Sequence, residues 1–300
     1  MKVEYKPLEE RTPDDQYRTL LESILTQGEL VPTRQGPGAL TLLGAQMRFD
    51  LRNGFPVITN RSIKGFWRKA IGELCAFING ARTLDQLAEF GCDWWGEWTS
   101  EAKCAKRGLE TGDIGPASYG AMFHDWPDAY GASFDQFEHL VRQIKEFPHD
   151  RTHLVSPWYG AWLARDSGRV NKATIAPCHG WVQVRVINGR LHLLMKQRSG
   201  DVPVGVPSNM VQYAALTLML CHLTGLEPGS YIHYIVDAHI YEDQVEHVQE
   251  MIRRESRIFP TVYLTEAGLE ETDIHDFRAE HFEISDYDPH PSILGIPVAT

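Results

Sequence analysis

The residues best suited to carry out chemistry lie between positions 178 and 241, and Cys178 is the first of them. It stands in the stretch IAPCHGWVQ, residues 175 to 183, between a proline and a histidine and just before a predicted strand. A thiolate is a strong nucleophile, so a cysteine in a suitable environment can attack an electrophilic carbon. A free cysteine is also a common small apolar core residue. The sequence around Cys178 therefore allows two interpretations, a nucleophile or a packing residue.

Other polar residues follow Cys178 in a dense run. They are His179, Gln197, Arg198, Ser199, Asp201, Asn209, His239 and Tyr241. Each of them, taken alone, has an ordinary structural explanation, such as a helix cap, a turn or a hydrogen-bonded group at a strand end. Only as an ordered set do they indicate a catalytic site.

Two other kinds of catalytic site are disfavoured by the spacing of histidines and cysteines. The 13 histidines include no HExxH or HxH grouping with a carboxylate at ligand spacing, and the five cysteines include no CxxC pair. Neither a metal hydrolase nor a structural zinc site is therefore predicted. A cysteine hydrolase that pairs Cys178 with His179 is also disfavoured, because adjacent strand residues point to opposite faces.

The elements that must position these residues follow from the hydrophobic pattern. Helices are predicted over residues 14–28, 64–79, 83–90, 134–146, 209–224 and 243–255. Residues 33–51 are predicted to be a loop leading into strands, and further strands are predicted over 153–160, 181–189, 191–199 and 232–241. Asn188-Gly189 is a hairpin signal between two of these strands, and the Gly-, Lys- and Glu-rich residues 100–118 are predicted to be a surface excursion. The pattern predicts one α/β domain, residues 1–300, with a large mixed sheet.

Composition excludes several partners. The net charge of −11 argues against general binding to nucleic acid or to anionic membranes. The longest apolar stretch, Met210 to Leu223, is too short and too polar to span a membrane. The N-terminal MKVEYKPLEER lacks the apolar core of a signal peptide, and the five irregularly spaced cysteines do not suggest a disulfide framework. A reducing, cytoplasmic location is therefore expected.

Three ordered segments carry a family resemblance. They are APCH, QRSGDVPVGVPSN and VDAHIY, and they resemble the thymidylate synthase family, whose pattern runs PCH, QRSxDxxLGxPFN and GDxHxY. Other segments match that family along nearly the whole chain: TRQG with LGAQMRFDL, GELCAFING, WWGEW, GPASYG, DRTHLVSPW and YDPHPSILGIPVAT. The resemblance implies an α/β (α+β) fold with a large mixed β-sheet that is packed by helices and lies at a dimer interface.

The resemblance also implies an activity. It implies that 5,10-methylenetetrahydrofolate supplies a one-carbon unit to C5 of a pyrimidine nucleotide, with no metal required. Cys178 would add to C6 of the ring, which gives C5 carbanion character. The residues that match the family's catalytic set are Cys178, Glu73, Tyr119 and Asp201. Glu73 would organise water and protonate the ring, and Tyr119 would help to remove the C5 proton.

The same resemblance assigns the binding residues. The nucleotide would be bound by Arg34, Arg151, Arg198, Ser199, Asn209, His239 and Tyr241. The folate would be bound by Trp95, Trp98, Asp201 and Gly205. Arg151 matches an arginine that the family supplies from the partner subunit, so a homodimer with shared sites is expected. Asn209 would read O4 and N3 of uracil, which favours dUMP.

Several positions depart from the methylating family. Ser208 replaces a phenylalanine, Ala76 a tryptophan, Val236 a glycine and Thr152 an arginine, and GPASYG is one residue longer than GPxYG. Loosened folate packing favours addition of water over hydride transfer, because a positioned reaction is sensitive to displacements of about 1 Å. The predicted product is therefore 5-hydroxymethyl-dUMP. Reductive methylation to dTMP, hydroxymethylation of CMP or dCMP, and a catalytically silent nucleotide-binding homologue remain the alternatives.

Overall fold

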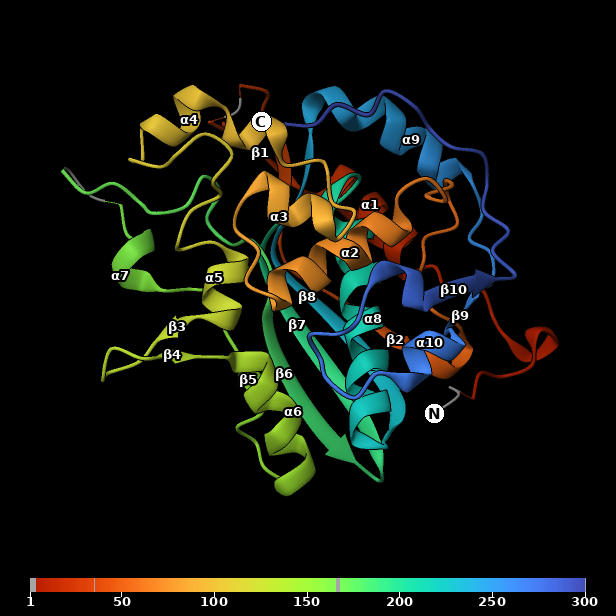
Figure 1. The fold of residues 1–300 in the computed structure, drawn as a ribbon. Coiled ribbons are helices and arrows are strands. Elements are labelled where there is room, and N and C mark those ends of the chain that lie inside the picture. The colour runs from red at the N-terminus through yellow and green to blue at the C-terminus, as the bar shows by residue number, and fades with distance from the viewer. Residues whose placement is uncertain (1–3, 35, 166–167, 300) are drawn as a thin grey trace.

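A six-stranded sheet forms the centre of the computed structural model, which describes residues 4–34, 36–165 and 168–299 (Figure 1). Its strands, in spatial order, are β1 (Glu29–Val31), β2 (Ala39–Asp50), β8 (Glu227–Tyr241), β7 (Arg190–Asp201), β6 (Trp181–Ile187) and β5 (Leu154–Val155). The β7–β8 pair is parallel and the other pairs are antiparallel. The prediction of a large mixed sheet is confirmed.

The long strands form because apolar residues alternate along them. In β6 the valines at 182, 184 and 186 are buried, and in β7 Leu191, Leu193 and Met195 are buried. The intervening side chains, such as Gln183 and Leu194, stay partly exposed on the opposite face. The hairpin between β6 and β7 turns at Asn188 (φ 51°) and Gly189 (φ 74°), as predicted, because this turn type requires positive φ at both central residues.

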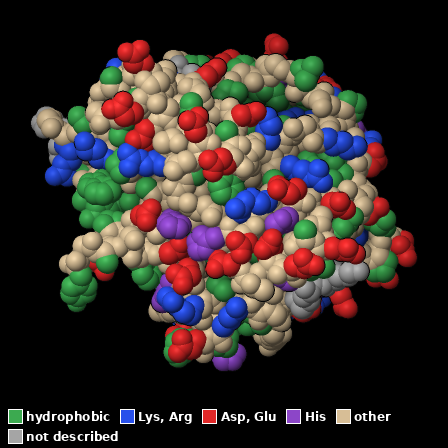
Figure 2. Space-filling model, in the orientation of Figure 1, with side chains coloured by type: hydrophobic (Ala, Val, Ile, Leu, Met, Phe, Trp, Pro, Cys, Tyr) green, Lys and Arg blue, Asp and Glu red, His purple; other side chains and the backbone are tan. Residues whose placement is uncertain are grey.

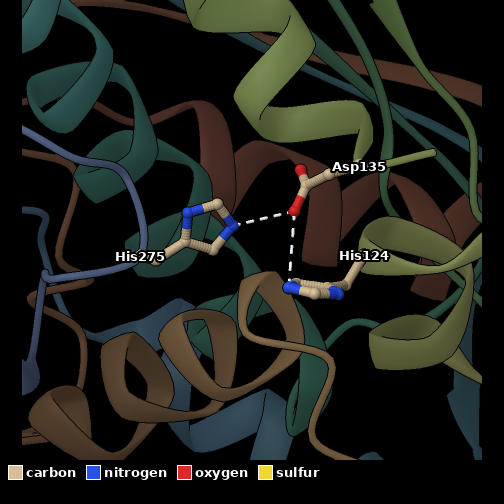
Figure 3. Close-up of side chains that lie close together, drawn as sticks. All are labelled: His124, Asp135 and His275. Carbon is tan, nitrogen blue, oxygen red and sulfur yellow. Dashed lines mark hydrogen bonds and ion pairs between the residues drawn. The ribbon is translucent and has the colours of Figure 1, made fainter. Parts of the chain in front are cut away.

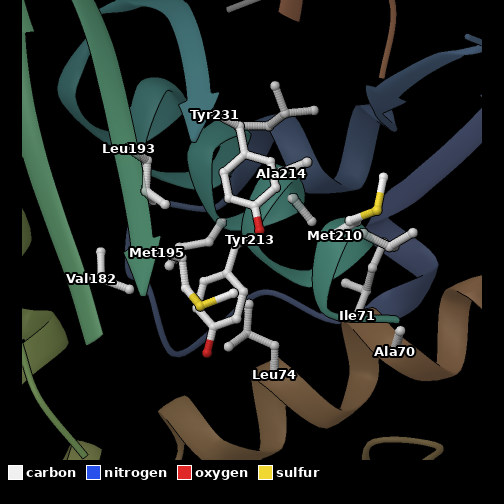
Figure 4. Close-up of a cluster of buried hydrophobic side chains, with 14 of the residues drawn as sticks. Ala70, Ile71, Leu74, Val182, Leu193, Met195, Met210, Tyr213, Ala214 and Tyr231 are labelled. Carbon is white, nitrogen blue, oxygen red and sulfur yellow. The ribbon is translucent and has the colours of Figure 1, made fainter. Parts of the chain in front are cut away.

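Helix α8 (Gly205–Thr224) connects the two parallel strands and is buried on nearly all sides. Such a helix must lie inside the molecule, since it has no polar face to turn towards water. It packs against β7, β8 and α2 (Trp67–Ile78). Figure 4 shows Ile71 and Leu74 of α2 facing Met210 and Tyr213 of α8, with Met195 of β7 beside Tyr213.

The remaining elements surround this centre. The other α-helices are α1 (Gln16–Gln27), α3 (Leu84–Glu89), α4 (Glu101–Ala105), α5 (Tyr119–His124), α6 (Gln136–Glu146), α7 (Gly160–Leu163), α9 (Val245–Arg253) and α10 (Glu266–Glu270). Two small sheets pair β3 (Trp126–Pro127) with β4 (Ser133–Phe134), and β9 (Thr261–Leu264) with β10 (Phe282–Ser285). In the described part of the chain, no helix has both the length and the apolarity to cross a membrane.

All six predicted helices are present, but some predicted boundaries are wrong. The helix predicted from residue 209 begins at Gly205. The helix can include Pro207, because this proline lies in its first turn, where the missing N–H would have had no partner within the helix. Of the strand predicted over 153–160, only Leu154 and Val155 are extended in the sheet, and Pro157 cannot donate to a ladder. The predicted surface excursion is also partly wrong, because 112–115 are buried and Asp113 pairs with Arg82.

Candidate active site

Cys178 lies in a tight turn immediately before β6. The turn depends on Gly180, whose φ is +101° and whose position leaves no room for a side chain, since a Cβ would lie 2.8 Å from Cζ of Phe123. Cys178 is partly exposed, whereas the other four cysteines are buried. Its exposure favours the nucleophile interpretation over the packing interpretation.

Arg198 of β7 holds its guanidinium beside the Cys178 sulfur. Its Nη2 lies 3.2 Å from Sγ and also donates to the carbonyl of Ala176, while Nε donates to the carbonyl of Pro177. The backbone N–H of Arg198 donates to the carbonyl of Cys178 at 2.7 Å. Burial raises the pKa of the Cys178 thiol, and the charge of Arg198 is the largest opposing influence. The arrangement stabilises a thiolate at a site that would otherwise disfavour it.

Tyr119, at the start of α5, reaches the same turn. Its hydroxyl accepts the backbone N–H of Cys178 at 2.6 Å, and its ring is stacked against Phe77 and against His179. Burial raises the pKa of Tyr119 well above 10. The extra residue in GPASYG therefore does not displace this tyrosine from Cys178.

His179 is turned away from the cysteine. Its Nδ1 lies 2.7 Å from the Tyr213 hydroxyl, and burial lowers its pKa to about 3. A neutral imidazole bonded to Tyr213 is not the general base of Cys178, in line with the interpretation that disfavoured a cysteine hydrolase.

Glu73 of α2 is a buried carboxylate surrounded by donors. Its Oε1 accepts from Nε1 of Trp94 at 2.5 Å and Nε1 of Trp95 at 2.6 Å, and its Oε2 accepts from Nε2 of Gln212 at 2.6 Å. Burial raises its pKa, and the hydrogen bonds from the tryptophans and Gln212 oppose the shift. Trp95, which is predicted to bind the folate, is buried, and its hydrogen bond supports the Glu73 carboxylate.

Asn209 lies in a chain of side-chain amides that ends at Glu73. Its Nδ2 donates to Oε1 of Gln212 at 2.9 Å, and its Oδ1 accepts from Nε2 of Gln197 at 3.0 Å. Oε1 of Gln197 lies 2.7 Å from Nε2 of His233. We name His233, Gln197, Asn209, Gln212 and Glu73 the amide chain. One N–H and one lone pair of the Asn209 amide remain available for a ligand.

Ser199, His239 and Tyr241, which are predicted to bind the nucleotide, lie where β8 runs between β2 and β7. Register pairs Ser199 with Asp237, and His239 with Asp201. Ser199 Oγ donates to Asp237 Oδ2 at 3.4 Å, and His239 Nδ1 lies 3.3 Å from Asp237 Oδ1. Tyr241 lies two residues further along β8, and its ring is in edge contact with the His239 ring.

Asp201 and the C-terminal tail meet through Gln244. Nε2 of Gln244 donates to Asp201 Oδ2 at 3.1 Å and to the carbonyl of Pro297 at 2.9 Å. Burial raises the pKa of Asp201 to about 6. Gly205 follows in the first turn of α8, and Trp98 is partly exposed beside Trp95, with ring centroids 6.0 Å apart.

Arg34 and Arg151, the other arginines predicted to bind the nucleotide, lie on the surface. Arg34 is exposed in the loop before β2. Arg151 is exposed before β5, whose Leu154 pairs with Gln183 of the antiparallel β6. The chain before Leu154 therefore runs away from Cys178, and a single chain does not bring Arg151 to its own nucleophile.

Several residues of this site were not predicted from the sequence. They are Trp94, Gln212, His233, Asp237 and Gln244. A signal was present for Gln212, because it stands three residues after Asn209 on an otherwise apolar helix, where side chains at that spacing are neighbours.

A second polar cluster, made of His124, Asp135 and His275, lies outside this site (Figure 3). Nε2 of His275 lies 2.8 Å from Asp135 and Nδ1 lies 2.7 Å from Asp273. Bonds to both carboxylates raise the pKa of His275 to about 9, and Figure 2 shows histidine side chains among acidic ones on this face. With both ring nitrogens donating, His275 has no lone pair for a metal, and we interpret the cluster as ion pairs.

The family comparison agrees with this geometry. The family model described as thymidylate synthase matches residues 15–299 of the chain.

Proposed function

This chain belongs to the thymidylate synthase family and is therefore an enzyme of folate-dependent one-carbon transfer to a pyrimidine nucleotide; we propose that its substrate is dUMP and that its product is 5-hydroxymethyl-dUMP. The observation that carries the covalent chemistry of this proposal is the contact of 3.2 Å between Nη2 of Arg198 and Sγ of Cys178. It supplies a partly exposed thiol with the cation that a nucleophilic thiolate requires.

The chemistry assigned to Cys178 is covalent. The thiolate forms a bond to C6 of uracil, and the electron pair of the C5–C6 double bond moves to give an enolate with carbanion character at C5. C5 then bonds to the carbon supplied by methylenetetrahydrofolate, the second substrate. Loss of the C5 proton and departure of tetrahydrofolate leave an exocyclic methylene. Water adds to that carbon, the C6–S bond breaks, and the thiolate is restored.

The surrounding residues serve the other needs of this reaction. Tyr119, with its hydroxyl at the Cys178 backbone, would help to remove the C5 proton, and Glu73 would organise water and protonate the ring. Trp98 and Asp201 are partly exposed and would hold the flat pterin ring by packing and by accepting its N–H groups. A reducing compartment such as the cytoplasm would keep Cys178 a free thiol.

Phosphate binding supports a homodimer. Nε and Nη2 of Arg198 are used within the chain, which leaves Nη1 without a hydrogen-bond partner among the described residues. Arg34 and Ser199 would bind the phosphate together with Nη1 of Arg198, and Arg151 of the partner subunit would complete the phosphate site. The partly exposed sheet face, with Trp181, Leu194 and Ile232 on it, would supply the contact.

The hydroxymethyl product rests on Ser208. This residue is partly exposed, directly before Asn209 on α8, where the family carries a phenylalanine. A smaller side chain there would leave the folate loosely packed, which favours water over hydride. Ala76 does not strengthen this argument, because it is buried inside α2. Reductive methylation to dTMP is the second candidate, since Trp98 and the tail held through Gln244 favour an ordered folate.

One incubation separates these outcomes. The enzyme is mixed with dUMP and methylenetetrahydrofolate, and the nucleotide is analysed by mass while dihydrofolate absorbance is followed. We expect a hydroxymethyl product without dihydrofolate, whereas a methyl product with dihydrofolate would favour the second candidate. Cys178→Ser should bind dUMP without turnover. Absence of any covalent adduct in the unmodified enzyme would contradict the proposed mechanism and favour a silent homologue.

A further inference from the structure

The amide chain has a definite hydrogen-bond direction at its Glu73 end. An indole Nε1 can only donate, so the bonds from Trp94 and Trp95 require Oε1 of Glu73 to accept twice. A proton on Glu73 would therefore lie on Oε2, which faces Gln212. An ionised Glu73 meets the amide nitrogen of Gln212, whereas a protonated Glu73 would require Gln212 to turn its amide around.

The other end of the amide chain is fixed by the backbone. Nε2 of Gln197 donates to Asn209 and also to the carbonyl of Ser199 at 3.0 Å. A carbonyl only accepts, so turning the Gln197 amide would place two oxygens against each other. Asn209 is therefore held at two anchors, with Oδ1 towards Gln197 and Nδ2 towards Gln212 in its observed orientation.

These two constraints meet at Gln212. If it turned its amide, its nitrogen would face the nitrogen of Asn209, and both are donors. Glu73, Asn209 and Gln212 are all buried, so bulk water cannot replace a hydrogen bond that is lost between them. The observed arrangement satisfies every bond only when Glu73 is a carboxylate and Asn209 has its present orientation.

We propose that Gln212 is a positioning residue that couples the ionisation of Glu73 to the orientation of Asn209, so that the proton-handling carboxylate and the base-reading amide act as one unit. The inference rests on the proposed role of Asn209 in reading the base. Uracil and cytosine present opposite donor and acceptor patterns at N3 and at the exocyclic position, so an amide with one orientation accepts one and rejects the other.

Other titratable groups that face Glu73 do not take over its role. Sγ of Cys92 donates to Oε1 at 3.7 Å, and the Tyr213 side chain interacts with Glu73 electrostatically. Burial raises the pKa of Cys92 and of Tyr213, so both stay neutral while Glu73 titrates.

Two variants of Gln212 separate its contacts. Both are made in the Cys178→Ser background, so that binding is followed and the thiol does not contribute to the pH dependence. Gln212→Glu keeps an acceptor for Asn209 but places a second carboxyl against Glu73, so the two share a proton. The pH midpoint at which the dUMP/dCMP binding preference falls should move up by about one unit or more, while the preference at neutral pH changes less than about twofold. Gln212→Leu removes both contacts, and it should reduce the preference about tenfold at neutral pH and abolish its pH dependence.

Thr217→Val is the matched control. Thr217 is buried on the same helix, and its hydroxyl donates to the carbonyl of Tyr213 within that helix. The control, in the same background, should change neither the preference nor its pH midpoint, although it removes a buried polar group. If both Gln212 variants weaken the binding of dUMP and dCMP equally and leave the preference and its pH dependence unchanged, Gln212 is only structural and the inference is wrong.

A measurement with Gln212 intact tests the coupling directly. The binding preference for dUMP over dCMP is recorded for Cys178→Ser as the pH is lowered, at pH values where both bases are neutral. We expect the preference to fall, because protonation of Glu73 removes one of the two anchors of Asn209. A preference that stays constant with pH would contradict the coupling. Absence of an adduct in the unmodified enzyme at every pH would contradict the proposed function instead.

Discussion

Replacement of Arg198 by glutamine should raise the pKa of the Cys178 thiol, because it removes the cation whose Nη2 lies 3.2 Å from Sγ. Two unit charges at this distance interact by about 1 kcal/mol in water and by about 5 kcal/mol at an effective dielectric constant of ~20. Cys178 is partly exposed, so we take an intermediate energy of about 1.5–4 kcal/mol. This corresponds to an upward shift of ~1–3 pKa units.

Alkylation by iodoacetamide measures this shift, because the reaction rate follows the thiolate fraction. The other four cysteines are buried, so the label should enter Cys178. Arg185→Gln makes the same charge change at a partly exposed position of β6 and is the control. An unchanged alkylation midpoint in Arg198→Gln would refute the assignment of Arg198 as the cation that stabilises the thiolate.

Three further predictions follow from individual contacts. His275→Gln should lower the free energy of unfolding by about 1 kcal/mol in urea titrations below pH 6.5. Since the folded pKa is raised to about 9, that stabilisation is lost as pH rises through 9, and a difference that persisted above it would contradict the ion-pair interpretation. Gln244→Ala should raise the folate KM about fivefold to tenfold while dUMP binding, followed by calorimetry, stays unchanged, because it releases Asp201 and Pro297. Ser208→Phe should increase dihydrofolate formation, and an unchanged methyl to hydroxymethyl ratio would remove Ser208 as the determinant of the product.

The sequence could predict the elements and the motif residues, because both leave local signals. The alternation along β6 and β7 and the turn at Asn188-Gly189 each depend on neighbours in the chain. The order of β8 next to β7, across a parallel crossover, was not predicted, since strand pairing depends on contacts between distant segments. The boundary errors near Pro157 and Pro207 have the same origin, because the effect of a proline depends on whether its missing N–H would have been paired.

The sequence singled out the motif residues of the candidate site but not the residues that support them. Cys178 and Arg198 stand in recognisable motifs, whereas Trp94 and His233 act through contacts with other elements. A buried tryptophan or histidine has the same sequence signature whether or not it bonds to a catalytic group. Arg151 illustrates a further limit of prediction from sequence. Its expected role needs a second copy of the chain, and contacts within one chain do not reveal such a role.

If Asn209 reads the base as proposed, helix α8 combines support and selectivity. Asn209, Gln212 and Tyr213 stand at positions i, i+3 and i+4 on it, which places them on one face of a largely apolar helix. Each buried polar group without a partner costs about 1–3 kcal/mol, so their hydrogen bonds stabilise the fold before any substrate binds. A base that matched the remaining N–H and lone pair of Asn209 would extend this network, and a base that opposed them would break it. Because the unpaired groups would then remain buried, we expect rejection of the wrong base to be stronger than the loss of one hydrogen bond alone would give.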